Sequence, residues 1–222
     1  GVATKNLIYP LFIMNTNGGK EEIPSMPGQF RFSKEELFKE VESCMSLGLS
    51  HFCLFPKVDE NLKDAKASYA LSDANYYYET IRSLKEKFSE ISIMTDVALD
   101  PYSSDGHDGI VENGKILNDP TIEVLAQMAL LQAQAGADII GPSDMMDGRV
   151  LKIRETLEKN AYDDTLIMSY TAKYASAFYG PFRDALDSAP KAGDKKTYQM
   201  NPLNKTEAIR EALLDEEEGA DI

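Results

Sequence analysis

The chain has 222 residues, of which 43% are hydrophobic and 27% are charged, proportions typical of a globular protein with a buried core. Its net charge of −14 argues against a nucleic-acid backbone or an anionic membrane surface as a partner. No apolar run reaches the length of a membrane span, and the first residues lack the pattern of a signal peptide. Only Cys44 and Cys53 are cysteines, which disfavours a disulfide scaffold and predicts a reducing compartment.

Short apolar strands alternate with amphipathic helices along the chain, beginning with a strand at residues 6–14. The first helix is predicted after Ser33, which forms a capping-box pattern with Glu36 three residues later. The other predicted helix N-caps are Ser72, Asp119 and Asn204. The later strands are predicted at residues 51–55, 92–97, 138–140, 166–169 and 197–200.

This order of elements predicts a parallel sheet whose faces are covered by helices. Polar residues such as Asp96, Ser143 and Lys173 follow strand ends, which form the catalytic rim of a (β/α)₈ barrel. We therefore expect one α/β domain, residues 1–222, built as a TIM-type barrel with about six strands and the start of a seventh. A doubly wound open sheet is the alternative, although no glycine fingerprint follows the first strand.

Residues 166–198 are the stretch around which the functional prediction is built. An apolar strand leads to Lys173, which is followed by several aromatic side chains and by the cations Arg183, Lys195 and Lys196. Desolvation by the rings and repulsion between like charges both favour the neutral amine, which forms Schiff bases with ketones. The alternative is an ordinary solvated loop lysine, because most lysines lie at the surface.

Four segments in the same order resemble the porphobilinogen synthase family, also called 5-aminolevulinate dehydratase. They are TDVALDPYSSDGHDG at 95–109, PSDMMDGR at 142–149, KYA at 173–175 and FYGPFRDA at 178–185. The resemblance extends over nearly the whole chain, from residue 6 to residue 222. It implies a TIM-type barrel and an enzyme of tetrapyrrole biosynthesis, which condenses two molecules of 5-aminolevulinate to porphobilinogen and releases two waters.

The resemblance also implies roles for individual residues. Lys173 matches the family lysine that holds the second (A-side) substrate as a Schiff base, and Asp96 matches a polar group that manages proton transfers at the reacting centre. Residues 173–197 match a lid that closes over this substrate and excludes water. The implied substrate contacts are Arg183 and Lys195, which bind the carboxylate, together with Gln199 and Ser143.

Metal binding depends on a few further positions. Zinc-dependent members carry cysteines where this chain has Ala98, Asp100 and Asp108, so we expect no active-site zinc and a place in the aspartate-rich, magnesium-responsive branch. Asp100 and Asp108 are candidate ligands of Mg²⁺ or a monovalent cation, and a metal-free polar centre is the favoured alternative. Glu211 matches the ligand of an allosteric magnesium between subunits, or else is an exposed helix glutamate. His107 is expected to fix its loop by hydrogen bonds, without a catalytic role.

Two features of the family have no counterpart in this sequence. The family's other Schiff-base lysine lies a few residues beyond the position of Ile222, and an N-terminal arm embraces a neighbouring subunit of an octamer. We therefore expect an excerpt of a longer homo-oligomeric enzyme, inactive by itself. The alternatives are a class I Schiff-base aldolase on a similar barrel and a non-catalytic fragment. The expected location is cytoplasmic, or a plastid if a transit peptide was removed.

Overall fold

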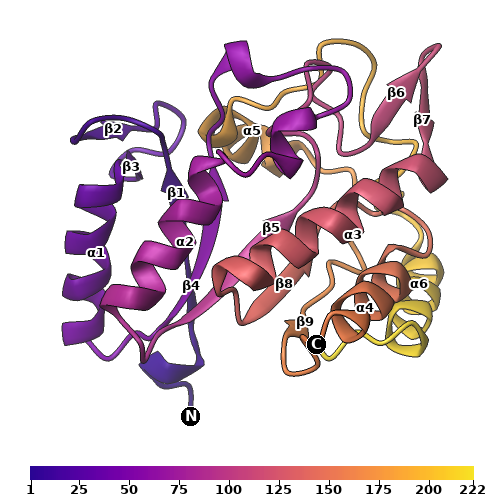
Figure 1. Ribbon diagram of the computed structural model, residues 1–222. Helices are drawn as coiled ribbons and strands as arrows, with labels where there is room; N and C mark the ends of the chain where they lie inside the picture. Colours follow the sequence, from indigo (N-terminus) through magenta and orange to yellow (C-terminus); the bar gives the residue numbers. More distant parts are fainter.

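A seven-stranded sheet forms the centre of the computed structural model, which describes residues 1–222 (Figure 1). In spatial order the strands are β2 (Lys20–Glu22), β3 (Phe30–Phe32), β1 (Ile8–Ile13), β4 (His51–Pro56), β5 (Ser92–Val97), β8 (Ile139–Pro142) and β9 (Leu166–Ile167). All neighbours pair in parallel except β2 with β3. A separate antiparallel hairpin contains β6 (Ile110–Glu112) and β7 (Lys115–Leu117).

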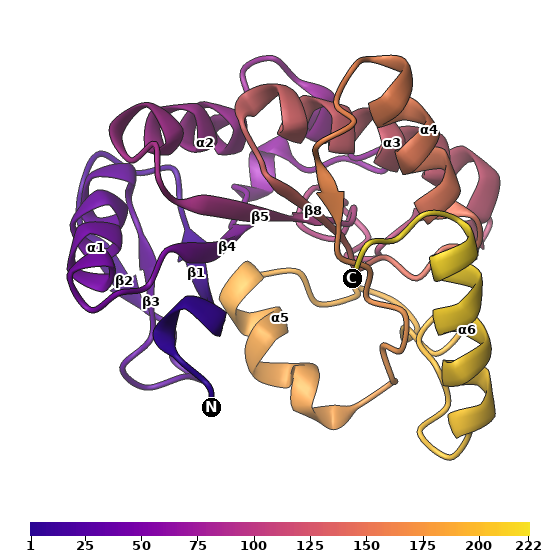
Figure 2. The same ribbon diagram turned by 90° about the horizontal axis from the view of Figure 1, so that it is seen from below.

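Six α-helices accompany the sheet. They are α1 (Lys34–Ser46), α2 (Tyr76–Lys87), α3 (Asn118–Ala135), α4 (Arg149–Lys159), α5 (Gly180–Leu186) and α6 (Lys205–Glu217). The sheet curves into an arc, with α1 to α4 along its outer side and α5 on its inner side (Figure 2). Parallel strands that curve in this way, with helices outside them, form the wall of a (β/α) barrel. No helix combines the length and the apolar composition that crossing a membrane requires.

Two of the four predicted helix starts are confirmed. Ser33 accepts a hydrogen bond from the backbone N–H of Glu36 at the start of α1. Asn204 accepts one from the backbone N–H of Glu207 at the start of α6. Each cap satisfies a backbone donor that has no partner within its helix, so the interaction is local and can be read from the sequence.

The other two helix starts differ from the prediction. Asn75, not Ser72, caps α2, because the Asn75 side chain accepts a backbone N–H of that helix while Ser72 bonds within the preceding turn. Helix α3 begins just before Asp119, whose carboxylate therefore lies in the first turn, where it complements the helix dipole. The predicted end of α3 at Gly136 is confirmed, since Gly136 adopts a left-handed φ of 112°.

Residues 197–200, predicted as a strand, lie outside the sheet. Their only β-bridge is an isolated one made by Met200. The backbone N–H of Ile222 donates to the carbonyl of Ile167 in β9 over 3.1 Å, so the last residues lie beside β9 in the place predicted for residues 197–200. The backbone of this segment instead turns back on Lys195, because the N–H groups of Tyr198 and Gln199 both donate to the Lys195 carbonyl. The five other predicted strands are confirmed.

The inner side of the arc is covered by an apolar cluster that includes helix α5. Phe12 of β1 and Phe55 of β4 stack on each other, and Phe182 of α5 packs edge-on against both rings. Ala185 and Leu186 of the same helix are fully buried in this cluster. Burial of these side chains fixes the polypeptide that follows Lys173 over the inner face of the sheet.

Candidate active site

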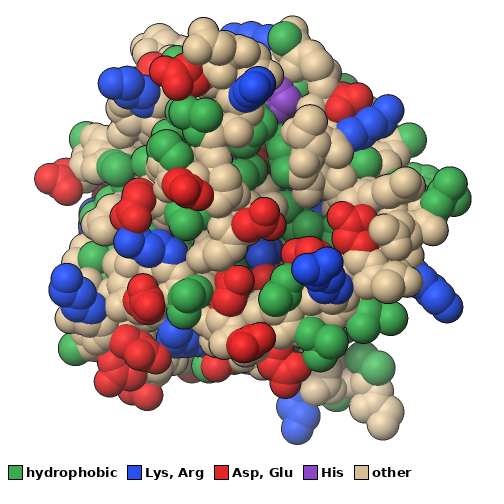
Figure 3. Space-filling view, turned by 90° about the vertical axis from the view of Figure 1, so that its right-hand side faces the viewer, with side chains coloured by type: hydrophobic (Ala, Val, Ile, Leu, Met, Phe, Trp, Pro, Cys, Tyr) green, Lys and Arg blue, Asp and Glu red, His purple; other side chains and the backbone are tan.

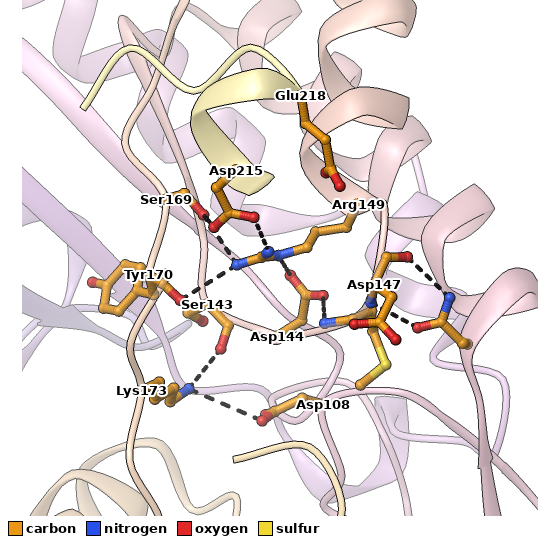
Figure 4. A network of polar contacts seen from close by, with 12 residues as sticks. Asp108, Ser143, Asp144, Asp147, Arg149, Ser169, Tyr170, Lys173, Asp215 and Glu218 are labelled. Carbon is orange, nitrogen blue, oxygen red and sulfur yellow. Dashed lines mark hydrogen bonds and ion pairs between the residues drawn. The ribbon is translucent and has the colours of Figure 1, made fainter. Parts of the chain in front are cut away.

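Three predicted site residues from separate elements meet at the carboxyl ends of the parallel strands. Asp96 lies in β5, Ser143 follows β8 and Lys173 follows β9. The Ser143 hydroxyl donates to the Asp96 carboxylate over 2.5 Å. The Lys173 ammonium donates to the Ser143 carbonyl over 2.7 Å (Figure 4). The side chains come together because parallel strands end at one edge of the sheet.

The Lys173 side chain is largely withdrawn from solvent, with an exposed fraction of 8%. Its Nζ lies 5.6 Å from the centre of the Tyr179 ring and 4.0 Å from Oδ2 of Asp108. The alternative of an ordinary solvated loop lysine is therefore wrong. The expected aromatic neighbour is present, but the closest charged group is a carboxylate.

Three carboxylates and two lysines share this site. Asp96, Asp100 and Asp108 are all buried. The buried Lys195 Nζ lies 2.9 Å from Oδ1 of Asp108 and 3.3 Å from Oδ2 of Asp100. Lys173 and Lys195 thus approach opposite oxygens of Asp108, and Oδ2 of Asp108 has no hydrogen-bond partner. An oxygen left in this state is available to a ligand or to a transferred proton.

The carboxyl groups differ in their affinity for protons. Burial and the negative charge of Asp100 raise the pKa of Asp96 to about 7, although the Ser143 hydrogen bond opposes this. Burial would raise the pKa of Asp100, but the charges of Lys195 and Lys173, together with hydrogen bonds that include one from Ser188, outweigh burial and lower that pKa. Burial would lower the pKa of Lys195, and its two carboxylate partners raise it instead. Lys195 therefore stays charged, whereas Asp96 exchanges its proton near neutral pH.

Two other predicted substrate contacts have side-chain groups without a protein partner. The Gln199 side chain is buried, and its Oε1 has no hydrogen-bond partner. Arg183 of α5 is half-buried, and its guanidinium has no hydrogen-bond or ion-pair partner. A free guanidinium and a free amide oxygen are groups that can bind a carboxylate and a donor of a small ligand.

Comparison with known proteins assigns the chain to a family. A family model described as delta-aminolevulinic acid dehydratase matches residues 1–222. The chain belongs to this dehydratase family. The "Delta-aminolevulinic acid dehydratase 1, chloroplastic" of Arabidopsis thaliana is 53% identical in an alignment of 225 residues, covering 100% of this chain and 52% of the relative. The Chlamydia pneumoniae dehydratase is 50% identical, with coverage of 100% of this chain and 67% of the relative.

A solved structure supports the same assignment. The delta-aminolevulinic acid dehydratase (porphobilinogen synthase) of Toxoplasma gondii ME49, in complex with the reaction product porphobilinogen, superposes with a TM-score of 0.97 at 52% identity. The match covers 99% of this chain and 63% of that chain. The predicted TIM-type barrel class is confirmed, and the doubly wound sheet is wrong. The chain spans about half the length of the Arabidopsis relative.

Asp100 and Asp108 are not free to act as metal ligands in this site. The Lys195 ammonium lies between the two carboxylates, where it supplies the positive charge that a cation would bring. No group of three or more His, Cys, Asp or Glu side chains lies together in a way that could hold a metal ion. The carboxylates, already paired with an ammonium, do not fit a metal in this arrangement.

Glu211 lies apart from these residues, on α6. It lines a cavity of about 980 Å³ between the β6–β7 hairpin, residues 192–200 and α6, on the face shown in Figure 3. Acidic side chains are spread over this face among apolar ones (Figure 3). Burial and the negative charges of Asp147 and Asp215 raise the pKa of Glu211. A cation here would relieve the repulsion, but this chain offers Mg²⁺ no complete cage, so water or other ligands would complete the shell.

Sequence reasoning missed Arg149, the first residue of α4. Its guanidinium bonds Asp215 over 2.6 Å, the Ser169 hydroxyl over 3.0 Å and the Tyr170 carbonyl over 3.3 Å (Figure 4). Its Nε also lies 3.8 Å from the Asp144 carboxylate. A signal was present, since Arg149 precedes two buried apolar side chains of α4 at helical spacing, which predicts that it too faces the core.

Proposed function

We propose that the protein to which these residues belong condenses two molecules of 5-aminolevulinate to porphobilinogen, as part of tetrapyrrole biosynthesis. The observation that carries the proposal is the group formed by Lys173, Ser143 and Asp96. The withdrawn amine donates to the backbone carbonyl of Ser143, and the hydroxyl of the same residue donates to a carboxyl that titrates at about 7. These are the components of imine formation at a ketone.

In the proposed reaction the Lys173 ammonium gives one proton to Oδ2 of Asp108, which lies 4.0 Å away and has no hydrogen-bond partner, and the neutral Nζ then attacks the ketone carbon of a substrate. The carbon–nitrogen bond forms, and the carbonyl oxygen leaves as water after taking up the two amine protons. Asp96 can relay these protons through the Ser143 hydroxyl, because its pKa of about 7 lets it both accept and donate near neutral pH. The buried setting excludes bulk water, which favours the imine.

The substrate carboxylate is proposed to bind Arg183, the cation of this region that has no protein partner. Lys195 contributes positive charge nearby while it remains paired with Asp100 and Asp108. Gln199 offers its free amide oxygen to the substrate amine. In this assignment the segment 173–197 acts as a lid, held over the sheet by the apolar contacts of α5.

Magnesium, assembly and location are part of the same proposal. Mg²⁺ would bind at Glu211 as the allosteric ion of the magnesium-responsive branch. Its positive charge would offset the repulsion between Glu211 and the neighbouring carboxylates Asp147 and Asp215. The protein is proposed to be a homo-oligomer, an octamer by family resemblance. Its location is proposed to be the cytoplasm or a plastid; the relatives include chloroplastic and bacterial dehydratases. The class I aldolase alternative disagrees with the family match, whereas a non-catalytic role for the 222 residues alone stays a prediction.

Reductive trapping tests the proposal. The full-length protein is incubated with 5-aminolevulinate and borohydride, and the modified lysines are located by peptide mass spectrometry. We expect a reduced adduct on Lys173 in the wild type and none at position 173 in Lys173→Arg. The proposal fails if Lys173 stays unmodified with 5-aminolevulinate, or if only a sugar phosphate gives the adduct. Release of porphobilinogen by the unmodified protein is measured in parallel.

A further inference from the structure

Residues 105–108 form a dock for the segment 189–198 (the docked segment), which carries Lys195. The backbone N–H of Lys191 donates to the carbonyl of Asp105 over 3.0 Å. At Gly106 the two backbones touch, because a Cβ placed there would lie 2.3 Å from a backbone oxygen of the docked segment. Gly106 also has a φ of +70°, a conformation that side chains rarely adopt.

His107 makes the central contacts of this dock. Its Nε2 lies 3.0 Å from the carbonyl of Ala192, and its Nδ1 lies 3.0 Å from the hydroxyl of Tyr198. A carbonyl can only accept, so the hydrogen-bond network assigns the proton of the neutral ring to Nε2. Nδ1 then accepts from the Tyr198 hydroxyl, which in turn accepts the backbone N–H of Asp108 over 3.3 Å.

The two contacts of His107 lie on either side of Lys195. In the sequence, Lys195 is midway between Ala192 and Tyr198. Its ammonium pairs with Asp108, the residue directly after His107. The imidazole is buried, with an exposed fraction of 8%, and both of its nitrogens are engaged, so neither is free to bind a metal or to reach a substrate.

We propose that His107 is a positioning residue that ties both ends of the Lys195 turn to the loop carrying Asp108. The imidazole donates to the Ala192 carbonyl and accepts from the Tyr198 hydroxyl. These two hydrogen bonds hold Lys195 in the position from which it contacts Asp100 and Asp108. His107 holds the docked segment against the loop of residues 105–108, and it takes no proton from the substrate. Only the catalytic readout of this inference rests on the proposed dehydratase function.

Hydrogen exchange of the full-length protein tests the tie directly. We expect faster exchange of the amides in residues 191–200 in His107→Ala than in the wild type, because both anchors are lost. His107→Gln restores a donor for Ala192 and should recover much of the protection. His51→Ala serves as the matched control. His51 is the other histidine of the chain and begins β4, at the end of the strand remote from the site, so its replacement should leave the exchange of residues 191–200 unchanged. Unchanged exchange in His107→Ala would overturn the proposal.

A kinetic readout separates positioning from chemistry. Loss of two hydrogen bonds predicts a KM for 5-aminolevulinate raised on the order of 10-fold in His107→Ala, with kcat changed much less. The double variant with Tyr198→Phe should lose less than the sum of the two single changes, because both single changes break the contact between His107 and Tyr198. A large fall in kcat with normal exchange would contradict positioning and indicate a chemical role. If no porphobilinogen is formed by the wild type, the proposed function fails, while the exchange result still decides the role of His107.

Discussion

Two buried groups of charges lie close together at the same edge of the sheet and differ in their construction. The lysine cluster contains Asp96, Asp100, Asp108, Lys173 and Lys195, and the arginine cluster contains Arg149, Asp144 and Asp215. The lysine cluster places point charges on flexible stems around a carboxyl that titrates at about 7. The arginine cluster uses one planar guanidinium to join the segments after β8 and β9 to α6.

The contrast shows that burial of charge serves two purposes in one region. A single guanidinium with several fixed acceptors holds chain segments in place, since its geometry is rigid. Two ammonium groups shared among three carboxylates leave an oxygen of Asp108 free and leave Asp96 able to change its protonation state. We therefore expect changes in the first cluster to affect turnover and changes in the second to affect stability.

Lys173→Ala should produce the largest effect. Removal of the nucleophile should lower turnover by about 10⁴-fold or more, while the free energy of unfolding changes little. Porphobilinogen formation and thermal unfolding of the full-length protein measure the two quantities. Lys196→Ala is the matched control, because Lys196 is an exposed lysine of the same segment. Substantial turnover by Lys173→Ala would remove the basis of the imine proposal.

Asp96→Asn should rank second. An amide cannot relay protons, so kcat is expected to fall by about 10²- to 10⁴-fold, the range of a general acid or base. In the wild type, the pH profile of kcat/KM, which reports groups of the free enzyme, should show a step near the pKa of Asp96, about 7. That step should be absent from the residual activity of Asp96→Asn, and its persistence would show that another group controls the profile.

Arg149→Ala should mainly reduce stability. Breaking a buried ion pair leaves Asp215 without its partner and should cost about 3–5 kcal/mol of unfolding free energy. Lys152→Ala on the same helix removes a more exposed pair with Glu123 and should cost about 0–1 kcal/mol. Chemical denaturation of the full-length variants measures both values. Equal effects of the two substitutions would contradict the structural role given to Arg149.

The pH dependence of stability should give the smallest and most specific signal. The pKa of Asp96 is raised to about 7 and that of Asp144 to about 6, chiefly by burial. Between about pH 4 and 7 the folded protein therefore binds more protons at these groups than the unfolded chain does. Their contribution to the free energy of unfolding is complete below about pH 4. It is lost as the pH rises through the folded-state pKa values of about 6 and about 7.

Each such group lowers the unfolding free energy by at most about 1.4 kcal/mol per pH unit within its window. Asp96→Asn should remove its share of this decline, so that the variant gains stability relative to the wild type on going from pH 4 to pH 7. Asp144→Asn is the companion variant, and its gain should be complete at a lower pH. Unfolding curves at several pH values measure the differences, and parallel curves for wild type and variants would contradict the assignment.

Local signals in the sequence located much of the fold. The caps Ser33 and Asn204 act on residues three positions away, so their patterns were sufficient. The rule that side chains gather at the ends of parallel strands brought Asp96, Ser143 and Lys173 together correctly. Boundaries decided by competition between nearby caps, as at the start of α2, were less predictable.

Interactions between distant residues could not be read in the same way. The predicted partner of Lys195 was a substrate carboxylate, yet the structure pairs it with Asp100 and Asp108, which precede it by 95 and 87 positions. No periodic pattern encodes such a contact. The strand predicted at residues 197–200 was wrong for a related reason, because this segment forms a turn that packs on the distant loop carrying His107.

The short strand β2 has a consequence for how the molecule avoids aggregation through an open strand edge. It forms one border of the sheet, and all three of its residues, Lys20, Glu21 and Glu22, are exposed and charged. Docking a foreign strand there would bring charges out of water along a border only three residues long. Aggregation through this border is therefore disfavoured, and a partly folded chain that has formed β1 to β3 is already protected on that side.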